Sequence, residues 1–428
     1  MSNNILIGSG LSSLGFLENI DKKKNFISYD KNAYVGGHAY SFDINNFYYD
    51  EGAHISHSSN KDFLKYIDSS NKKKFNEFKS IVFNFYKEKK IGYPIQFNLK
   101  DLNFFEKIQY FSEYFFKKKN HKNHKNQNYH EWLLNSYGSF LTNKYYKMYT
   151  EKYWRTDMKE MSVNWVKGRL AEKNIFDTLM SLFFNNMNKS LVYNKFRYPV
   201  CGGFFNAFKN KYEKFNFNLN HKVTKIDTRN KQIFFKNGKV VNYNILTSSI
   251  PLNEYIHLIK ELPDWAKDTL SHLKYTKLIT YNYKLKRKIN HDFHWCYFYD
   301  KAIPISRMSI LSNFNQQKQK NYYNVQAEVF YRNDEKIDFS DYDSKTRDHV
   351  IKFFNLKNNE DLIFEKKIFV EKAYPIPLIG DREKINDTIH WLRQNNIYPI
   401  GLYGNWKFMW SDQTFLNGKE VADEINQL

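Results

Sequence analysis

The sequence predicts an α/β fold in which a domain with a parallel central sheet is interleaved with a second, α+β domain of antiparallel strands and helices. Three observations over the 428 residues support this prediction. A strand–turn–helix–strand pattern occupies the first 30 residues. Apolar and polar residues alternate between 275 and 335, which is typical of antiparallel strands. A glycine-bounded turn and an amphipathic helix follow after residue 398.

The N-terminal segment, NILIGSGLSSLGFLENI over residues 4–20, indicates a Rossmann-like β-turn-α-β unit. Residues 4–8 are predicted as a strand and 11–20 as a helix. The segment FISYD, residues 26–30, is predicted as the second strand because apolar and aromatic residues dominate it.

The turn after the first strand has the residues of a dinucleotide site, with one departure. Gly8 permits a tight turn, and Gly10 permits close approach of the backbone to a pyrophosphate. Ser13 stands where the third glycine of G-x-G-x-x-G is expected, and a residue this small still allows helix–strand packing. Asp30 follows about 20 residues later, where an acidic side chain accepts hydrogen bonds from ribose hydroxyls.

The middle of the chain indicates two further kinds of structure. Residues 60–190 show a helical, aromatic pattern with lysine-rich polar faces, whereas 218–249 alternate like short antiparallel strands. We therefore expect a discontinuous nucleotide-binding domain, a helical substrate or cap region and a substrate domain with an antiparallel sheet. The predicted boundaries are 1–65, 195–255 and 385–428 for the first, 66–194 for the second and 256–384 for the third.

The formal net charge is +21, and basic residues are densest in FFKKKNHKNHKNQNYH, residues 115–130. This charge suits a polyanionic partner or peripheral contact with a membrane surface. A general lysine bias, with this segment as an exposed loop after a buried helix, is the alternative. No nucleic-acid motif accompanies the charge, so specific nucleic-acid binding is not expected.

Patterns that are absent from the sequence indicate the cellular compartment of the protein. No apolar run is long enough for a transmembrane helix, and the N-terminus shows no secretory signal pattern. Cys201 and Cys296 form neither a metal-ligand pattern nor a disulfide framework, so no metal is expected. These features predict a cytoplasmic protein, with contact at the inner face of the membrane as a peripheral association.

A second glycine pair follows the nucleotide unit in KNAYVGGHAYS, where Gly36 and Gly37 lie shortly after Asp30. With this pair, residues 4–66 resemble the FAD-dependent amine-oxidase-type flavoproteins, in particular UDP-galactopyranose mutases and protoporphyrinogen-oxidase-like proteins. The stretch GGHAYSFDINNFYYDEGAHISHSS resembles the mutases most closely. The resemblance implies FAD as the cofactor, with His54 near the flavin ring and His57 nearby.

Further segments resemble the same families, in the same order along the chain: YTEKYWRTDMKEM, RYPVCGGFFNAF, HKVTKI, LTSSIPLNEYI, DKAIPISRMSILSNF and GLYGNWKFMWSDQTFLNG. The resemblance implies that the last segment closes over the flavin, where a helix N-terminus can stabilise developing negative charge. It also implies that the backbone of Val223 pairs with the adenine. The implied FAD-binding residues are Gly8, Gly10, Ser12, Ser13, Asp30, Lys31, Gly36, Gly37, His38, His54, Val223, Gly404, Asp412, Gln413 and Thr414.

The resemblance also implies catalytic candidates: His54, Tyr149, Trp154 and Arg307. Mutases grip a sugar-nucleotide diphosphate through arginines and tyrosines, which form charge-assisted hydrogen bonds. At two such positions this chain has other residues, because Leu402 stands where the mutases have an arginine and Phe408 where they have a tyrosine.

Three functions therefore stay open. We expect an FAD-dependent oxidoreductase in which flavin N5 accepts a hydride from a small or sugar-type substrate. The first alternative is a mutase-like isomerase that acts on a sugar nucleotide without net oxidation. The second alternative is a basic flavoprotein that binds a membrane or polyanion and catalyses nothing.

Overall fold

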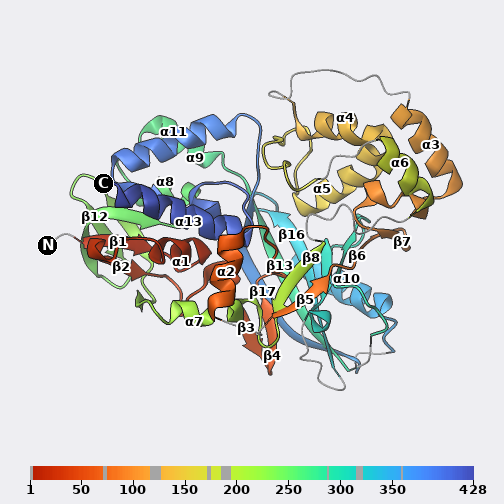
Figure 1. The fold of residues 1–428 in the computed structure, drawn as a ribbon, viewed down its shortest axis with the longest axis horizontal. Helices are drawn as coiled ribbons and strands as arrows, with labels where there is room; N and C mark the ends of the chain where they lie inside the picture. The colour runs from red at the N-terminus through yellow and green to blue at the C-terminus, as the bar shows by residue number, and fades with distance from the viewer. Residues whose placement is uncertain are drawn as a thin grey trace.

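Two large sheets organise the protein, one in each half of the molecule (Figure 1). The computed structural model describes residues 3–70, 75–115, 127–170, 175–184, 194–286, 289–314, 322–357 and 360–428. The segment predicted as a basic loop, residues 115–130, lies largely outside these ranges.

The first sheet contains the predicted nucleotide unit. Its strands are β1 (Asn3–Ile7), β2 (Phe26–Tyr29), β9 (Phe217–Asn218), β10 (Val223–Asp227), β11 (Gln232–Phe235), β12 (Val240–Ser248) and β18 (Ile397–Pro399). A parallel part runs in the order β18-β12-β1-β2-β9. The predicted antiparallel strands are β10, β11 and the beginning of β12. The rest of β12 joins the parallel part, because one long strand serves both arrangements.

Strand β1 is apolar throughout its centre because both faces of the sheet are covered. Ile5 and Ile7 belong to a hydrophobic cluster with residues of α9 (Asp264–Ser271) and α11 (Asp381–Gln394). Leu6 points to the opposite face and packs with residues of α1 (Leu11–Leu17) and α13 (Ser411–Asn426).

Helices α1 and α13 cross at very close range through two glycines. A Cβ on Gly15 would lie 2.0 Å from the carbonyl oxygen of Phe415, and a Cβ on Gly418 would lie 1.9 Å from that of Ser12. Any side chain at either position would force the helices apart. The C-terminal helix is thereby held against the N-terminal turn.

The second sheet has the order β17-β13-β16-β15-β14-β6-β7. Neighbouring strands are antiparallel, except that β14 and β6 are parallel. The bounds are β6 (Val82–Tyr86), β7 (Lys89–Gly92), β13 (Tyr275–Leu285), β14 (Trp295–Phe298), β15 (Arg307–Ile310), β16 (Tyr323–Arg332) and β17 (Leu362–Pro375). Two small sheets pair β3 (Ser41–Ile44) with β4 (Phe47–Asp50) and β5 (Phe75–Lys79) with β8 (Lys195–Pro199).

The helical prediction for residues 60–190 is wrong between 75 and 92, where β5, β6 and β7 lie. Strands β6 and β7 pair with each other, but the partners that hold these strands in larger sheets lie far away in sequence, since β6 also pairs with β14 and β5 pairs with β8. Long-range pairing of this kind leaves little trace in a local pattern that is rich in aromatic residues.

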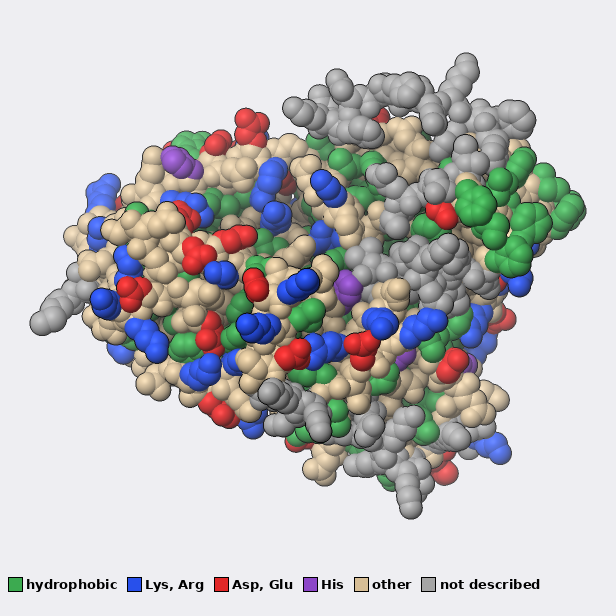
Figure 2. Space-filling view, viewed as in Figure 1, with side chains coloured by type: hydrophobic (Ala, Val, Ile, Leu, Met, Phe, Trp, Pro, Cys, Tyr) green, Lys and Arg blue, Asp and Glu red, His purple; other side chains and the backbone are tan. Residues whose placement is uncertain are grey.

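The remaining helices are α2 (Lys61–Ser70), α3 (Phe104–Phe115), α4 (Tyr129–Leu141), α5 (Lys147–Tyr153), α6 (Ile175–Phe183), α7 (Lys209–Tyr212), α8 (Tyr255–Leu258), α10 (Phe339–Phe353) and α12 (Gly401–Gly404). Helices α3, α4, α5 and α6 form a group beside the second sheet (Figure 1). The helix expected to be buried before the basic segment is α3, and its outer side is exposed (Figure 2). Within the described ranges, no helix combines the length and the apolar character needed to cross a bilayer.

Candidate functional site

A cavity of about 690 Å³ is lined by residues of both large sheets. Its wall includes the loops at the carboxyl ends of β1, β2 and β12, which is where open parallel sheets bind their ligands. On the other side it includes residues of β14, β15 and β17. Cavities of this size hold small-molecule ligands or cofactors.

The turn after β1 requires glycine at one position and leaves space at another. Gly8 has a φ of +101°, and a Cβ there would lie 1.9 Å from Oγ of Ser249. Gly10 has an ordinary φ of −73°. A Cβ on Gly10 would meet no atom within 4 Å, so a side chain there would enter the space in front of the turn.

Ser9 connects this turn to the two other predicted nucleotide elements. Its Oγ donates a hydrogen bond of 2.6 Å to Oδ2 of Asp30, and its carbonyl accepts one of 2.9 Å from the N–H of Gly36. A Cβ on Gly37 would lie 3.1 Å from Cα of Gly10, so the two glycine turns touch. Asp30 is thus buried and oriented at the end of β2, with further lone pairs available on its carboxylate.

Most of the residues predicted to bind the cofactor line this cavity. They are Gly8, Gly10, Ser12, Asp30, Lys31, Gly36, Gly37, His38, His54, Val223 and Thr414. Four others do not line it. Ser13 is fully buried, and a Cβ on Gly404 would lie 3.2 Å from the carbonyl oxygen of Ser248. Asp412 accepts a hydrogen bond of 2.6 Å from Ser58, and Gln413 contacts Arg169.

His54 is held in the wall by packing and is kept neutral. Its ring stacks on Phe204 at 5.5 Å, and the N–H of Phe204 donates to the buried carboxylate of Asp50 at 3.0 Å. Desolvation, together with the positive charge of Arg307 and with His38, lowers the pKa of His54 to about 4. His54 is therefore an uncharged ring at neutral pH.

Arg307 lines the cavity, but its charge is balanced by a carboxylate. Its Nε and Nη2 donate to the two oxygens of Glu328 at 2.9 and 2.7 Å, and Glu328 is fully buried. The backbone of Ala53 completes the arrangement, because its N–H donates to Glu328 at 3.0 Å and its carbonyl accepts from Arg307 at 3.3 Å. The pair therefore fixes the residue next to His54.

Arg169 is a second arginine in the cavity wall, and the sequence motifs did not identify it. It donates to the carbonyls of Trp165 and Phe408 at 2.9 and 3.1 Å, and to the side chain of Gln413 at 2.9 Å. Its guanidinium lies 4.6 Å from the ring centre of Phe408 and 4.8 Å from that of Trp410. Among the described residues it forms no ion pair, and desolvation lowers its pKa to about 10.

One of the two departures from the mutase pattern, Phe408, lies beside this arginine in space. Leu402 and Phe408 both line the cavity, and the ring of Phe408 supports the guanidinium of Arg169. The available sequence signal for Arg169 was the scarcity of arginine in a chain dominated by lysine. That signal alone gives no position in the fold.

Aromatic residues form the remaining wall. Tyr149 stacks on Tyr153 at 5.4 Å and meets Tyr297 edge to face at 5.4 Å. Trp154 lies 5.9 Å from Tyr374. Tyr149 and Trp154 were predicted for the pocket, whereas the other three tyrosines were not, because the chain is so rich in tyrosine that single residues carry little information.

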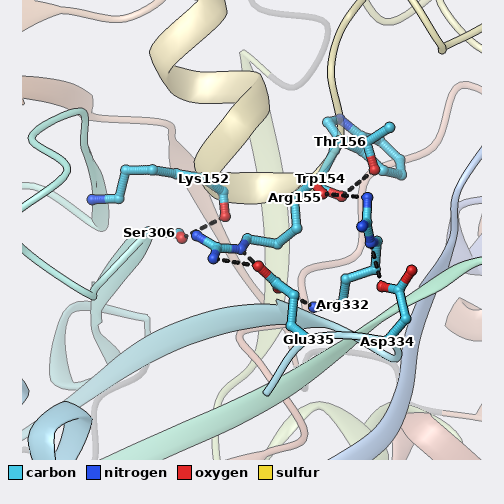
Figure 3. Close-up of polar contacts among 8 residues, drawn as sticks. All are labelled: Lys152, Trp154, Arg155, Thr156, Ser306, Arg332, Asp334 and Glu335. Carbon is cyan, nitrogen blue, oxygen red and sulfur yellow. Dashed lines mark hydrogen bonds and ion pairs between the residues drawn. The ribbon is translucent and has the colours of Figure 1, made fainter. Parts of the chain in front are cut away.

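The turn that carries Trp154 is held from behind by polar contacts (Figure 3). Arg155 has a φ of +53°, which is unfavourable for a residue with a side chain. Its Nε and Nη2 donate to Glu335 at 3.0 and 2.6 Å. Arg332 donates to the carbonyl of Arg155 at 3.3 Å, and its own N–H donates to Glu335 at 2.6 Å. These bonds hold the strained turn in place.

Known proteins share the nucleotide unit and the overall fold of this chain. Residues 6–69 match the family model of the NAD(P)-binding Rossmann-like domain. A structure of reduced UDP-galactopyranose mutase is similar over 99% of this chain and 95% of that chain, with 22% identity and a TM-score of 0.90.

Two oxidases are more distant. A putative protoporphyrinogen oxidase from Exiguobacterium sp. 255-15 covers 100% of this chain and 99% of its own, with 12% identity and a TM-score of 0.74. A putrescine oxidase redesigned in cofactor binding covers 100% and 99%, with 12% identity and a TM-score of 0.66. The predicted fold and the predicted resemblance are confirmed: the chain has a Rossmann-like domain within the fold that the structures of this mutase and these oxidases share.

Proposed function

We propose that this protein binds FAD in the cavity and uses it to isomerise a sugar nucleotide. The observation that supports the cofactor is the open space in front of Gly10, bordered by Gly37 and by the oriented carboxylate of Asp30. Backbone that carries no Cβ allows a pyrophosphate to approach, and Asp30 can accept hydrogen bonds from ribose hydroxyls. When bound, FAD supplies a ring whose N5 can accept a hydride or, in the reduced state, act as a nucleophile.

The choice of reaction depends on Arg169. The other arginine of the cavity wall, Arg307, is already neutralised by Glu328, so Arg169 is the arginine whose positive charge is left to bind a diphosphate. Arg169 supplies that charge from a desolvated position, with its Nε buried and without a hydrogen-bond partner among the described residues. A guanidinium of this kind binds phosphate oxygens through charge-assisted hydrogen bonds.

The remaining wall would orient the sugar and exclude water from it. Tyr149, Tyr153 and Tyr297 place ring faces and hydroxyls around the cavity, and such groups bind a sugar through both contacts. The neutral ring of His54 can donate or accept one hydrogen bond without adding charge. Arg307 orients the wall through Glu328 and need not carry the diphosphate.

An FAD-dependent oxidoreductase is the second candidate, and a specific observation favours it. Leu402 and Phe408 add apolar side chains to the cavity wall, which suits a substrate without a diphosphate. The two candidates differ in whether an electron acceptor is consumed.

The test measures turnover of UDP-galactopyranose by the purified protein, with oxidised flavin and after reduction by dithionite. The proposal expects conversion only by the reduced protein, with no acceptor consumed. Arg169→Ala should lower kcat/KM about a hundredfold while flavin content stays the same, and Arg169→Lys should recover part of the loss. Rapid reoxidation in air, with oxygen consumed in proportion to substrate, would instead establish the oxidoreductase.

A further inference from the structure

Helices α3 and α6 expose large hydrophobic side chains on the same side of the molecule. Phe105 and Phe183 are 80% and 67% exposed. Figure 2 shows hydrophobic side chains gathered over these helices, at the right-hand end of the view. We call this surface the α3–α6 face; it consists of Phe104, Phe105, Ile108, Phe111, Phe176, Leu179, Phe183 and Phe184.

Helix α6 exposes several of its large apolar side chains, although Leu182 is buried. Thr178 and Ser181 are fully buried, whereas Phe176 and Phe183 point outward. A surface helix in water normally buries its apolar side and exposes its polar side. An apolar area that covers two neighbouring helices marks a contact surface.

The sequence next to this face is strongly basic. Helix α3 ends at Phe115, and Lys117, Lys118 and Lys119 follow almost directly in the sequence. From 117 to 125 the sequence has lysine, histidine and asparagine and no acidic residue. These basic residues lie outside the described ranges, and their charge follows from the sequence alone.

We propose that the α3–α6 face docks on the surface of an anionic lipid bilayer. Aromatic and aliphatic side chains enter the boundary between headgroups and acyl chains, while the positive charge of the protein is attracted by anionic headgroups. The net charge of +21 acts in the same direction. No residue of α3 or α6 lines the cavity, so docking leaves the site itself free of contacts.

A second copy of the chain fits this face less well. In a symmetric dimer the same face meets itself. Each copy carries a net charge of +21, and two such copies repel each other. A bilayer with anionic headgroups removes that repulsion.

The experiment is co-sedimentation of the full-length protein with vesicles of phosphatidylcholine, with and without phosphatidylserine. Wild type should bind vesicles that contain phosphatidylserine, and more weakly in high salt. Phe105→Ser with Phe183→Ser should lower the partition coefficient about tenfold for each substitution, because each removes a ring from the lipid. The matched control is Trp265→Ser on α9, in the other half of the molecule, where a tryptophan is 48% exposed; it should bind as wild type does.

Three outcomes would overturn the proposal. Wild type could fail to bind either vesicle, or the double variant could bind as tightly as wild type. Sedimentation velocity without lipid could show a wild-type dimer that the double variant converts to monomer, which would assign the face to a second copy. Equal flavin content and melting temperature in wild type and variant establish that folding is intact.

Discussion

The two ends of the cavity are built in different ways. The end near Gly8 and Gly10 consists of backbone turns, and its shape depends on the absence of side chains. The end near Arg169 and Arg307 consists of side chains from distant segments, held by charge and aromatic packing. Backbone turns suit a ligand that stays the same, such as a cofactor. At the second end, single substitutions of side chains can change which substrate is bound.

The largest effect should follow from filling the backbone end. Gly10→Val places a branched side chain in open space, at a φ of −73° that valine adopts without strain. The variant should fold but purify without flavin, which visible absorbance measures. Gly10→Ala should retain part of the flavin. Normal flavin in the valine variant would mean that the pyrophosphate lies elsewhere.

At the side-chain end, breaking the buried pair should cost stability. Arg307→Leu leaves Glu328 buried without its partner, which destabilises a protein by about 3–5 kcal/mol. Urea unfolding of the flavin-free protein measures this loss. Arg307→Leu combined with Glu328→Leu should be more stable than the single variant. If the single variant unfolds at the same urea concentration as wild type, the pair of Arg307 and Glu328 does not stabilise the cavity wall.

A smaller effect is expected behind Trp154. Glu335→Gln weakens the bonds that hold the strained Arg155 turn, in which both side chains are partly exposed. If the weakened turn raises the free energy of the transition state by about 1 kcal/mol, kcat should fall about fivefold, with flavin content unchanged. The matched control is Lys345→Gln, which removes an exposed ion pair on α10 and should leave turnover as it is.

The smallest effect concerns pH. The pKa of His54 is lowered from 6.5 to about 4, so between these values the unfolded chain binds a proton that the folded protein excludes. Stability therefore falls as the pH drops through this window, and His54→Asn should fall less steeply. Urea unfolding at several pH values compares the two proteins. If the free energies of unfolding of the two proteins change with pH in the same way, His54 titrates normally in the folded protein.

Different parts of the site were predictable to different degrees. The Rossmann-like turn, Asp30 and the second glycine pair were predictable because each is a short contiguous pattern with a backbone requirement. Strands β5 and β6 were not, because their partners β8 and β14 lie far away in sequence. For the reaction, the sequence emphasised Leu402 and Phe408, and Arg169 lies beside Phe408 only after folding.

By itself the sequence determined where a nucleotide can bind, since glycine spacing and an acidic strand end act locally. Only the tertiary structure decided which charges reach the cavity. Arg307 meets Glu328 across neighbouring strands, and Arg169 meets Gln413 from the other end of the chain. Arg307 is neutralised by a carboxylate, whereas Arg169 meets a neutral amide and keeps its charge. Because folding brings these partners together, the sequence alone does not show which arginine stays charged.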